Sequence, residues 1–429
     1  MSNAASGSKY EKMSITKDGR EVNLVGKVTS FDYYESLLSP NITATMSFID
    51  TGNAIESNRK TDRQERVGSI YNSLPITGEE QIKFKITNQL GTLDFIKTPL
   101  LVNNAVNLKQ ESERESVGLN LISDSGIRNH SIPLSEEYTG LISNSVKKIL
   151  KESFGLPDER INVDKTQYPY NFKGYNKTPF ENLLKLAPKS TVNGGDPGYF
   201  FYETRKGMNF KSIDSLIKVD PKQIPVYYYS GGLKSSVDSN INDNKIISYT
   251  IGKNQNIINA LRSGVYESRN VCWNPLTFEY VEFVLSLSNN ELKVSLGSEV
   301  PKLETSSNNY SRTYHHILDV GFQSQGIDFS VNNNPCLYVA KSTMRYNLLM
   351  SQVINMTIPC NPNLVAGDII RCEFEKITKS EKEQGGFDQN QSGNYMILNL
   401  SHHFEPNKSY TGLTLVRDSF GIYTNKNKE

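Results

Sequence analysis

Two pairs of neighbouring histidines, His315-His316 and His402-His403, are the side chains of this sequence whose type could bind a metal ion. On a β-strand, neighbouring side chains point to opposite faces, so neither pair alone forms a two-ligand site. A zinc site would need a third and a fourth ligand, which the sequence does not suggest. We therefore interpret these residues as structural histidines and predict no metal site and no cofactor.

Other motifs that carry chemistry fail at specific positions. The run that begins at Asp238 starts like a calcium loop, but it has Asp and Tyr where the sixth and twelfth positions require Gly and Glu. The glycine-rich stretch 194–198 lacks the Gly-Lys-Ser/Thr ending of a phosphate loop, and no Gly-x-Ser-x-Gly elbow is present. Acidic pairs such as Glu79-Glu80 are usually solvated rather than catalytic. We predict no catalytic residue and expect that the protein is not an enzyme.

The composition argues against a protein that binds nucleic acid tightly. The 429 residues carry 47 Lys and Arg against 46 Asp and Glu, a net charge of +1. A protein that neutralises many phosphates has a clear basic excess. The 23 Tyr and 18 Phe residues, against a single Trp, favour a β-rich fold.

The cysteines and the termini indicate an intracellular product without a membrane anchor. None of the four cysteines has the two-residue spacing of a zinc or redox motif, and four thiols in a chain of this length fit a reducing cytoplasm better than a disulfide scaffold. Cys360 and Cys372 could face each other across a hairpin, but we favour buried thiols. No apolar run approaches the roughly 18 residues of a spanning helix. Residues 1–8 lack the apolar core of a signal peptide, and we expect a mobile N-terminus over 1–20.

Residues 21–120 have the pattern of a first β-domain. Ala44, Met46 and Phe48 alternate with polar residues, and the stretch 82–86 repeats the pattern. This period of two predicts half-buried strands. About six or seven such strands between turns indicate a sandwich or a barrel.

Residues 121–245 predict an α+β domain. The clearest helix covers 139–154, with one apolar face and lysines on the other. A second helix begins at Thr178, with Pro179 at its first position and Glu181 three residues after the cap, which is the capping-box spacing. Its apolar positions are Phe180, Leu183, Leu184 and Ala187.

A hairpin and a short helix complete this domain. Residues 199–202 and 208–210 predict two strands around a turn at Arg205-Lys206-Gly207, and Ser212 can cap the helix that follows. The unit 178–217 is therefore helix, hairpin, helix, and it would orient neighbouring sheets.

Residues 246–429 predict a second β-domain, interrupted by a long polar excursion around 299–334. We expect helices at 256–263 and 341–352 and strands at 353–358, 369–374, 392–397 and 413–419. The stretches 74–84 and 364–374 echo each other, since both contain Leu, a turn, Gly and an acidic residue before an alternating strand.

The order of these motifs resembles the baseplate hub proteins of contractile-tailed bacteriophages, which are related in fold to the spike trimers of type VI secretion. The resemblance rests on the capped helix, the glycine loop, Tyr-Phe-Phe-Tyr-Glu-Thr-Arg-x-Gly and Asn-Phe-Lys-Ser-Ile-Asp-Ser-Leu within 178–217, and on 341–420. The Leu-Pro-Ile-x-Gly-Glu turn at 74–79 is also similar to that family. The resemblance implies a mostly β fold with two similar, tube-like β-barrels, at 21–120 and 246–429, and an α+β domain at 121–245.

The resemblance also implies a function and a set of partners. Such a subunit forms a homotrimeric ring that adapts the sixfold tail tube to the threefold central spike and surrounds a channel for DNA and the tape-measure protein. Its location would be the baseplate of the virion, with contacts to tube or tube-initiator proteins. A type VI-like injection spike, a tail enzyme that degrades peptidoglycan and a carbohydrate-binding adhesin are the alternatives.

Overall fold

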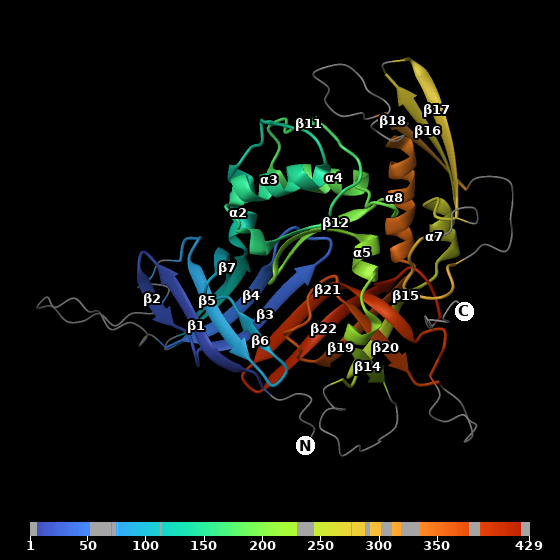
Figure 1. Ribbon diagram of the computed structural model, residues 1–429. Coiled ribbons are helices and arrows are strands. Elements are labelled where there is room, and N and C mark those ends of the chain that lie inside the picture. Colours follow the sequence, from blue (N-terminus) through green and yellow to red (C-terminus); the bar gives the residue numbers. More distant parts are fainter. Residues whose placement is uncertain are drawn as a thin grey trace, which may run out of the picture.

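A computed structural model describes residues 7–51, 70, 74, 76–111, 114–229, 244–275, 277–287, 292–301, 311–318, 335–376 and 387–421. The fold is mostly β, with 48% strand and 19% helix. It is built around one sheet of 14 strands, in which the N-terminal and C-terminal parts of the chain lie side by side (Figure 1). The α-helices α2, α3 and α4 lie above this sheet in the same view.

The strands of the large sheet come from three separate stretches of the chain. They are β1 (Lys9–Lys17), β2 (Arg20–Asn23), β3 (Val28–Ser36), β4 (Thr43–Asp50), β5 (Gln81–Thr87), β6 (Thr92–Asp94), β7 (Leu100–Glu111), β8 (Arg114–Ile122), β14 (Val226–Tyr229), β15 (Ser248–Asn254), β19 (Gln352–Pro359), β20 (Ile369–Phe374), β21 (Gly393–Glu405) and β22 (Lys408–Arg417). Their order is β15-β19-β22-β21-β3-β4-β8-β7-β5-β1-β2, with β6 on β5 and with β20 joining β14 to β21. The β14–β20 pair is parallel and the other pairs are antiparallel. Among the described strands this path is open, with β15 and β2 at its ends.

The period-two pattern predicted the buried side of these strands correctly. Ala44, Met46 and Phe48 on β4 are at most 1% exposed, and the inward residues of β5 are fully buried. Phe31 of β3 lies 4.7 Å from Phe84 of β5, measured between ring centroids, so the sheet curls around its core. This core is continuous through both parts of the chain.

The expectation of a mobile N-terminus over 1–20 is wrong for the residues of β1. This strand pairs with β5 in antiparallel register, and Met13 and Ile15 are fully buried. Its apolar residues are few, so the sequence pattern alone did not predict it.

The α+β unit has its own core, and it contains the predicted helices and hairpin together with one further helix and three short strands that the sequence pattern did not predict. Its elements are α2 (Asp124–Ser131), β9 (Glu137–Tyr138), α3 (Ile142–Phe154), β10 (Ile161–Val163), β11 (Phe172–Lys173), α4 (Pro179–Leu186), β12 (Tyr199–Thr204), β13 (Gly207–Ser212) and α5 (Ile213–Ile217), with 3-10 turns at Asp158–Arg160, Ala187–Lys189 and Pro221–Gln223. The capping box is confirmed: Thr178 accepts from the N–H of Glu181 at 3.4 Å, and the Glu181 carboxylate accepts from the N–H of Thr178 at 3.0 Å. Leu184 was wrongly placed on the buried face, since it is 44% exposed and Leu186 is buried instead.

A smaller unit carries the remaining helices and a three-stranded sheet. It comprises α7 (Ile257–Arg262), β16 (Glu267–Asn274), β17 (Glu279–Ser286), β18 (Arg312–Ile317) and α8 (Pro335–Leu349). Because β18 pairs in parallel with β16, the excursion predicted at 299–334 contains a strand; its residues 302–310 and 319–334 lie outside the described part. The polar composition of β18 explains why the pattern did not reveal it.

The cysteines are only partly as predicted. Cys360 and Cys372 are buried free thiols, and burial raises the pKa of Cys360 to about 12. Cys272, however, is part of a disulfide bond whose partner is not among the described side chains, which corrects the expectation of four reduced thiols.

Candidate functional site

A polar, mostly uncharged face lies on the outer side of the large sheet. The alternation that turns Phe31 and Tyr33 into the core turns small polar residues outward on the same strands. They surround a shallow hollow of about 570 Å³, lined by Tyr34, Glu35, Ser36, Ser248, Tyr249, Thr250, Asn355, Met356, Thr357, Asn399, Leu400, Ser401, Gly412, Leu413 and Thr414. Glu35 is the one Asp, Glu, Lys or Arg among these lining residues, and it is buried. This face can therefore offer hydrogen bonds but little net charge.

Glu35 holds three segments together beneath this face. Its carboxylate accepts hydrogen bonds from the Tyr33 hydroxyl at 2.7 Å, from the N–H of Arg205 at 2.7 Å and from the N–H of Ala366 at 2.9 Å. Burial raises the pKa of Glu35 to about 7, although these hydrogen bonds act to lower it. The β12–β13 turn and the turn before β20 are thus fixed to β3. A glutamate at an inward position of an alternating strand was the signal that sequence reasoning missed.

The two stretches that echo each other in the sequence form similar turns. Each contains a glycine with positive φ, 114° at Gly78 and 90° at Gly367. In each, an acidic side chain accepts from the backbone N–H three residues before it, Glu80 at 2.8 Å and Asp368 at 3.0 Å. Each acidic residue directly precedes a strand, β5 or β20. A similar turn therefore starts one strand in each part of the large sheet.

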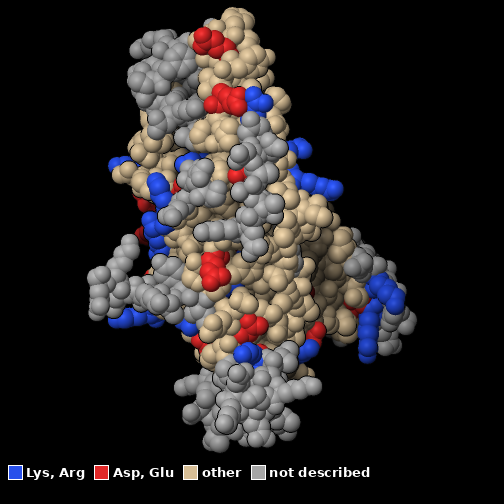
Figure 2. Space-filling view, turned by 90° about the vertical axis from the view of Figure 1, so that its right-hand side faces the viewer, with Lys and Arg blue, Asp and Glu red and all other residues tan. Residues whose placement is uncertain are grey.

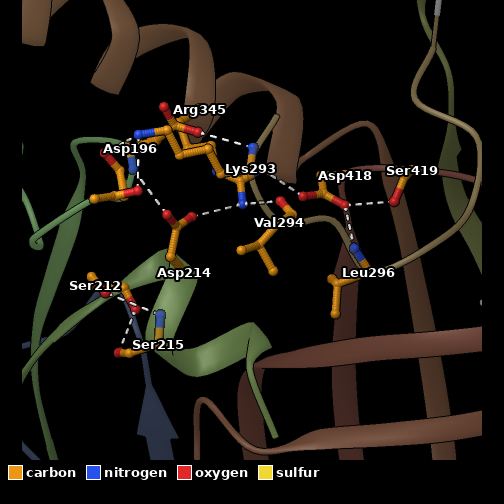
Figure 3. A network of polar contacts seen from close by, with 12 residues as sticks. Asp196, Ser212, Asp214, Ser215, Lys293, Val294, Leu296, Arg345, Asp418 and Ser419 are labelled. Atoms are coloured by element: carbon orange, nitrogen blue, oxygen red, sulfur yellow. Dashed lines mark hydrogen bonds and ion pairs between the residues drawn. The ribbon is translucent and has the colours of Figure 1, made fainter. Parts of the chain in front are cut away.

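A buried ion cluster joins α8 to the α+β unit and to the end of the large sheet (Figure 3). The Arg345 guanidinium donates to Asp418 at 2.7 Å, to Asp214 at 3.2 Å and to the Val294 carbonyl at 2.7 Å. The side chains of Arg345, Asp214 and Asp418 are at most 2% exposed. Asp418 also accepts from the N–H of Leu296 at 3.0 Å. The cluster can fix the relative positions of α5, α8 and β22, and the helix prediction for 341–352 did not reveal this role of Arg345.

The histidines of the second pair play different structural roles. His402 is fully buried, stacks on Tyr33 with ring centroids 5.9 Å apart, and pairs through Nδ1 with the Thr411 hydroxyl at 2.9 Å. Burial lowers its pKa to about 3. His403 points to the outer face, as the strand period predicted. Burial alone would lower its pKa, but its contacts with the carboxylates of Asp32 and Glu405 raise it overall.

The two histidines of the first pair lie on opposite sides of β18. His315 is exposed and His316, on the other side of β18, lies 3.3 Å from the Asn270 side chain. In the described ranges, no three His, Cys, Asp or Glu side chains come together in a way that could hold a metal ion. No described helix is long and apolar enough to cross a membrane.

Comparison with known proteins confirms the resemblance to baseplate hub proteins. No family model matches the chain. It is 23% identical over 296 residues to the probable baseplate hub protein gp334 of Vibrio phage KVP40, a match that covers 65% of this chain and 66% of that relative, just under two thirds of its length.

Two solved structures share the fold over nearly their whole length. The tail protein from Neisseria meningitidis MC58 aligns with a TM-score of 0.54 and 10% identity, over 96% of this chain and 97% of that one. The 43 kDa tail protein of prophage MuSo2 from Shewanella oneidensis aligns with a TM-score of 0.53 and 10% identity, over 95% and 98%. The chain therefore has the fold of phage tail proteins and is similar in sequence to a baseplate hub protein. Baseplate hub and tail proteins are virion components, which confirms the predicted location.

Proposed function

We propose that this chain is a structural hub subunit of a phage baseplate, and that three copies form a ring of six similar β-units. The observation that supports the ring is an internal repeat of strand order. The order β3-β4-β8-β7-β5 in the first part of the sheet corresponds to β15-β19-β22-β21-β20 in the second. The sixth strands, β1 and β14, occupy the same place but run in opposite directions, since β1 is antiparallel to β5 and β14 is parallel to β20. Each part would contribute one barrel-like unit, so that a trimer has sixfold quasi-symmetry.

The correspondence extends to residue-level details. Against β8, strand β7 has a bulge between Val102 and Asn104; against β22, strand β21 has one between Ile397 and Asn399. The N–H of Val102 donates to the carbonyl of Glu80 at 2.9 Å, and the N–H of Ile397 donates to the carbonyl of Asp368 at 2.9 Å. A bulge at the same place in both parts of the sheet supports an internal repeat, since each bulge is a specific feature of the strand register.

The second part also curls back on itself as a barrel would. Tyr228 of β14 forms a parallel bridge with Lys245, a few residues before β15 begins. The N–H of Tyr228 donates to the Asn244 carbonyl at 3.1 Å, and that of Ile246 donates to the Tyr228 carbonyl at 2.9 Å. We accordingly propose β-barrel domains at 21–120 and 246–429, each extended by one strand from outside its range, and an α+β domain at 121–245.

The proposed ring would match two symmetries. Three identical chains in a closed, head-to-tail ring offer threefold symmetry to a central spike, while six similar β-units offer near-sixfold symmetry to the tail tube and its initiator proteins. The outer polar face would line the channel through which DNA and the tape-measure protein pass. The lining of the hollow contains one Asp, Glu, Lys or Arg, the buried Glu35, which suits passage without binding. On the side of the molecule seen in Figure 2, charged side chains are scattered without a large patch of one sign.

Electron microscopy of the purified protein tests this function. The proposal expects threefold rings with six lobes and a central hole, and particles without a ring at any concentration contradict it. Cell-wall zymography addresses the competing enzyme hypothesis: the hub proposal expects no clearing, because we assign no catalytic residue to this chain. A zone of clearing that persists after repurification contradicts that assignment.

A further inference from the structure

We propose that β15 of one copy pairs with the outer part of β7 of the next copy, and that this contact repeats between subunits the β21–β3 pairing within one subunit. The inference rests on the proposed ring and specifies its interface. It concerns two strand edges that the described chain leaves without a partner.

The model for the contact is the internal seam between the two β-units. Strand β21 uses its first residues to pair with β20, from Gly393 to Met396. Its later residues pair with β3 in antiparallel register, with Leu400 opposite Glu35 and His403 opposite Asp32. One strand therefore closes its own unit and also joins the neighbouring unit.

Strand β7 is the counterpart of β21. It pairs with β5, as β21 pairs with β20, but within the described chain no strand takes the place that β3 has beside β21. The beginning of β7, at Leu100 and Leu101, pairs with β5. From Asn104 to Glu111 it pairs with β8, and no other described strand pairs with its opposite side. Strand β15 is the counterpart of β3, and within the described chain it pairs with β19 alone. Such edges expose unpaired N–H and C=O groups and are templates for a further strand.

Burial at equivalent positions supports a missing partner. Equivalent positions follow from the residue pairs between neighbouring strands in the two parts of the sheet. By this comparison, Ala105 on β7 corresponds to Leu400 on β21, and Asn254 on β15 corresponds to Glu35 on β3. Leu400 and Glu35 are 1% and 2% exposed, whereas Ala105 and Asn254 are exposed. Likewise Ile251 is 36% exposed, while Tyr33, its counterpart, is fully buried. The proposed register places Ala105 of one copy opposite Asn254 of the next.

The two edges differ, so the contact is head-to-tail and propagates in one direction. A heterologous contact either closes into a ring or continues as a filament, depending on the rotation between copies. If the rotation repeats the internal one, three β7–β15 contacts alternate with three β21–β3 seams and the ring closes at three copies. Each closed ring would leave none of these six edges unpaired.

Cysteine cross-linking tests the contact directly. The double variant Ala105→Cys with Asn254→Cys is treated with a short bismaleimide, since directly opposite residues in an antiparallel pair have Cβ atoms roughly 5 Å apart. We expect covalent species that end at three copies on a denaturing gel. The single variants Ala105→Cys and Asn254→Cys, which retain the native cysteines, should give no three-copy species.

An edge-blocking variant provides a second measurement. Ala105→Lys places a charge at an exposed edge position that the folded monomer tolerates but the proposed contact would bury, so association should weaken about tenfold or more. The matched control is Leu184→Lys on α4, where Leu184 is 44% exposed and belongs to neither strand of the contact, and its association should match that of the wild type.

The outcomes separate this inference from the proposed function. Trimers that form normally but give no specific Ala105–Asn254 product, and that Ala105→Lys does not weaken, contradict the interface while leaving the ring intact. A wild-type chain that remains monomeric at every concentration contradicts the ring and the interface together. Cross-linked species that continue beyond three copies contradict ring closure.

Discussion

Replacing Arg345 by methionine should destabilise the protein strongly. The change leaves Asp214 and Asp418, each at most 2% exposed, without their shared counter-charge. Removing one partner of a buried ion pair costs about 3–5 kcal/mol, because the remaining charge stays desolvated. A cost of this size is a large part of the stability of a typical domain, about 5–15 kcal/mol.

The assay is denaturant unfolding of the full chain, compared with an exposed pair of the same chemistry. Arg269 donates to both carboxylate oxygens of Glu282, at 2.6 and 2.7 Å, but these side chains are 39% and 44% exposed. Arg269→Met should therefore cost less than about 1 kcal/mol. The triple variant Arg345→Met, Asp214→Asn, Asp418→Asn should recover part of the lost stability, since it removes the uncompensated charges.

Two results would contradict this role of the buried ion cluster. If Arg345→Met costs no more than Arg269→Met, the cluster does not hold α8 in place. If the triple variant is less stable than Arg345→Met alone, the loss does not come from the unpaired carboxylates.

Three further predictions concern single positions. The pKa of His402 in the folded protein, about 3, lies below its value in the unfolded chain, so the unfolded chain takes up the proton first as the pH falls. The free energy of unfolding should therefore decrease by up to about 1.4 kcal/mol for each pH unit lowered between about pH 6 and pH 4. In urea titrations at several pH values, His402→Phe should lose this part of the pH dependence. Thr178→Ala removes the hydrogen bond that the Thr178 hydroxyl accepts from the N–H of Glu181 and should lower the unfolding free energy by about 1 kcal/mol, whereas Thr178→Ser should change it little; an equal loss in both variants contradicts the capping role. Gly367→Ala should lower the melting temperature, because the residue has a φ of 90° and the new Cβ would lie 2.7 Å from the Tyr202 hydroxyl oxygen; Gly19→Ala, at a φ of 78° in open space, should have a smaller effect.

Local signals in the sequence predicted much of the fold. The capping box at Thr178, the hairpin over 199–212 and the alternation on β4 all depend on neighbouring residues, which is why they could be seen in the pattern. The echo between 74–84 and 364–374 likewise reflects a local turn chemistry that both stretches share.

Features that depend on distant contacts could not be predicted in the same way. Helix α2 is polar and buries Ser125, Gly126 and Asn129, so it has no apolar stripe to recognise. The β21–β3 seam joins residues more than 360 positions apart, as in the hydrogen bond from Ser36 to Asn399 at 2.6 Å, and no local pattern specifies such a pairing. The polar outer face combines residues of β3 with residues of β15, β19, β21 and β22, so it exists only when the β21–β3 seam has formed.

Native mass spectrometry of the purified protein shows whether the chain assembles into a ring of three copies on its own. The proposed ring predicts a species of about 145 kDa, three copies of the 48.3 kDa chain, that persists on dilution into the low micromolar range. A monomer as the sole species at high protein concentration would contradict a self-assembling hub.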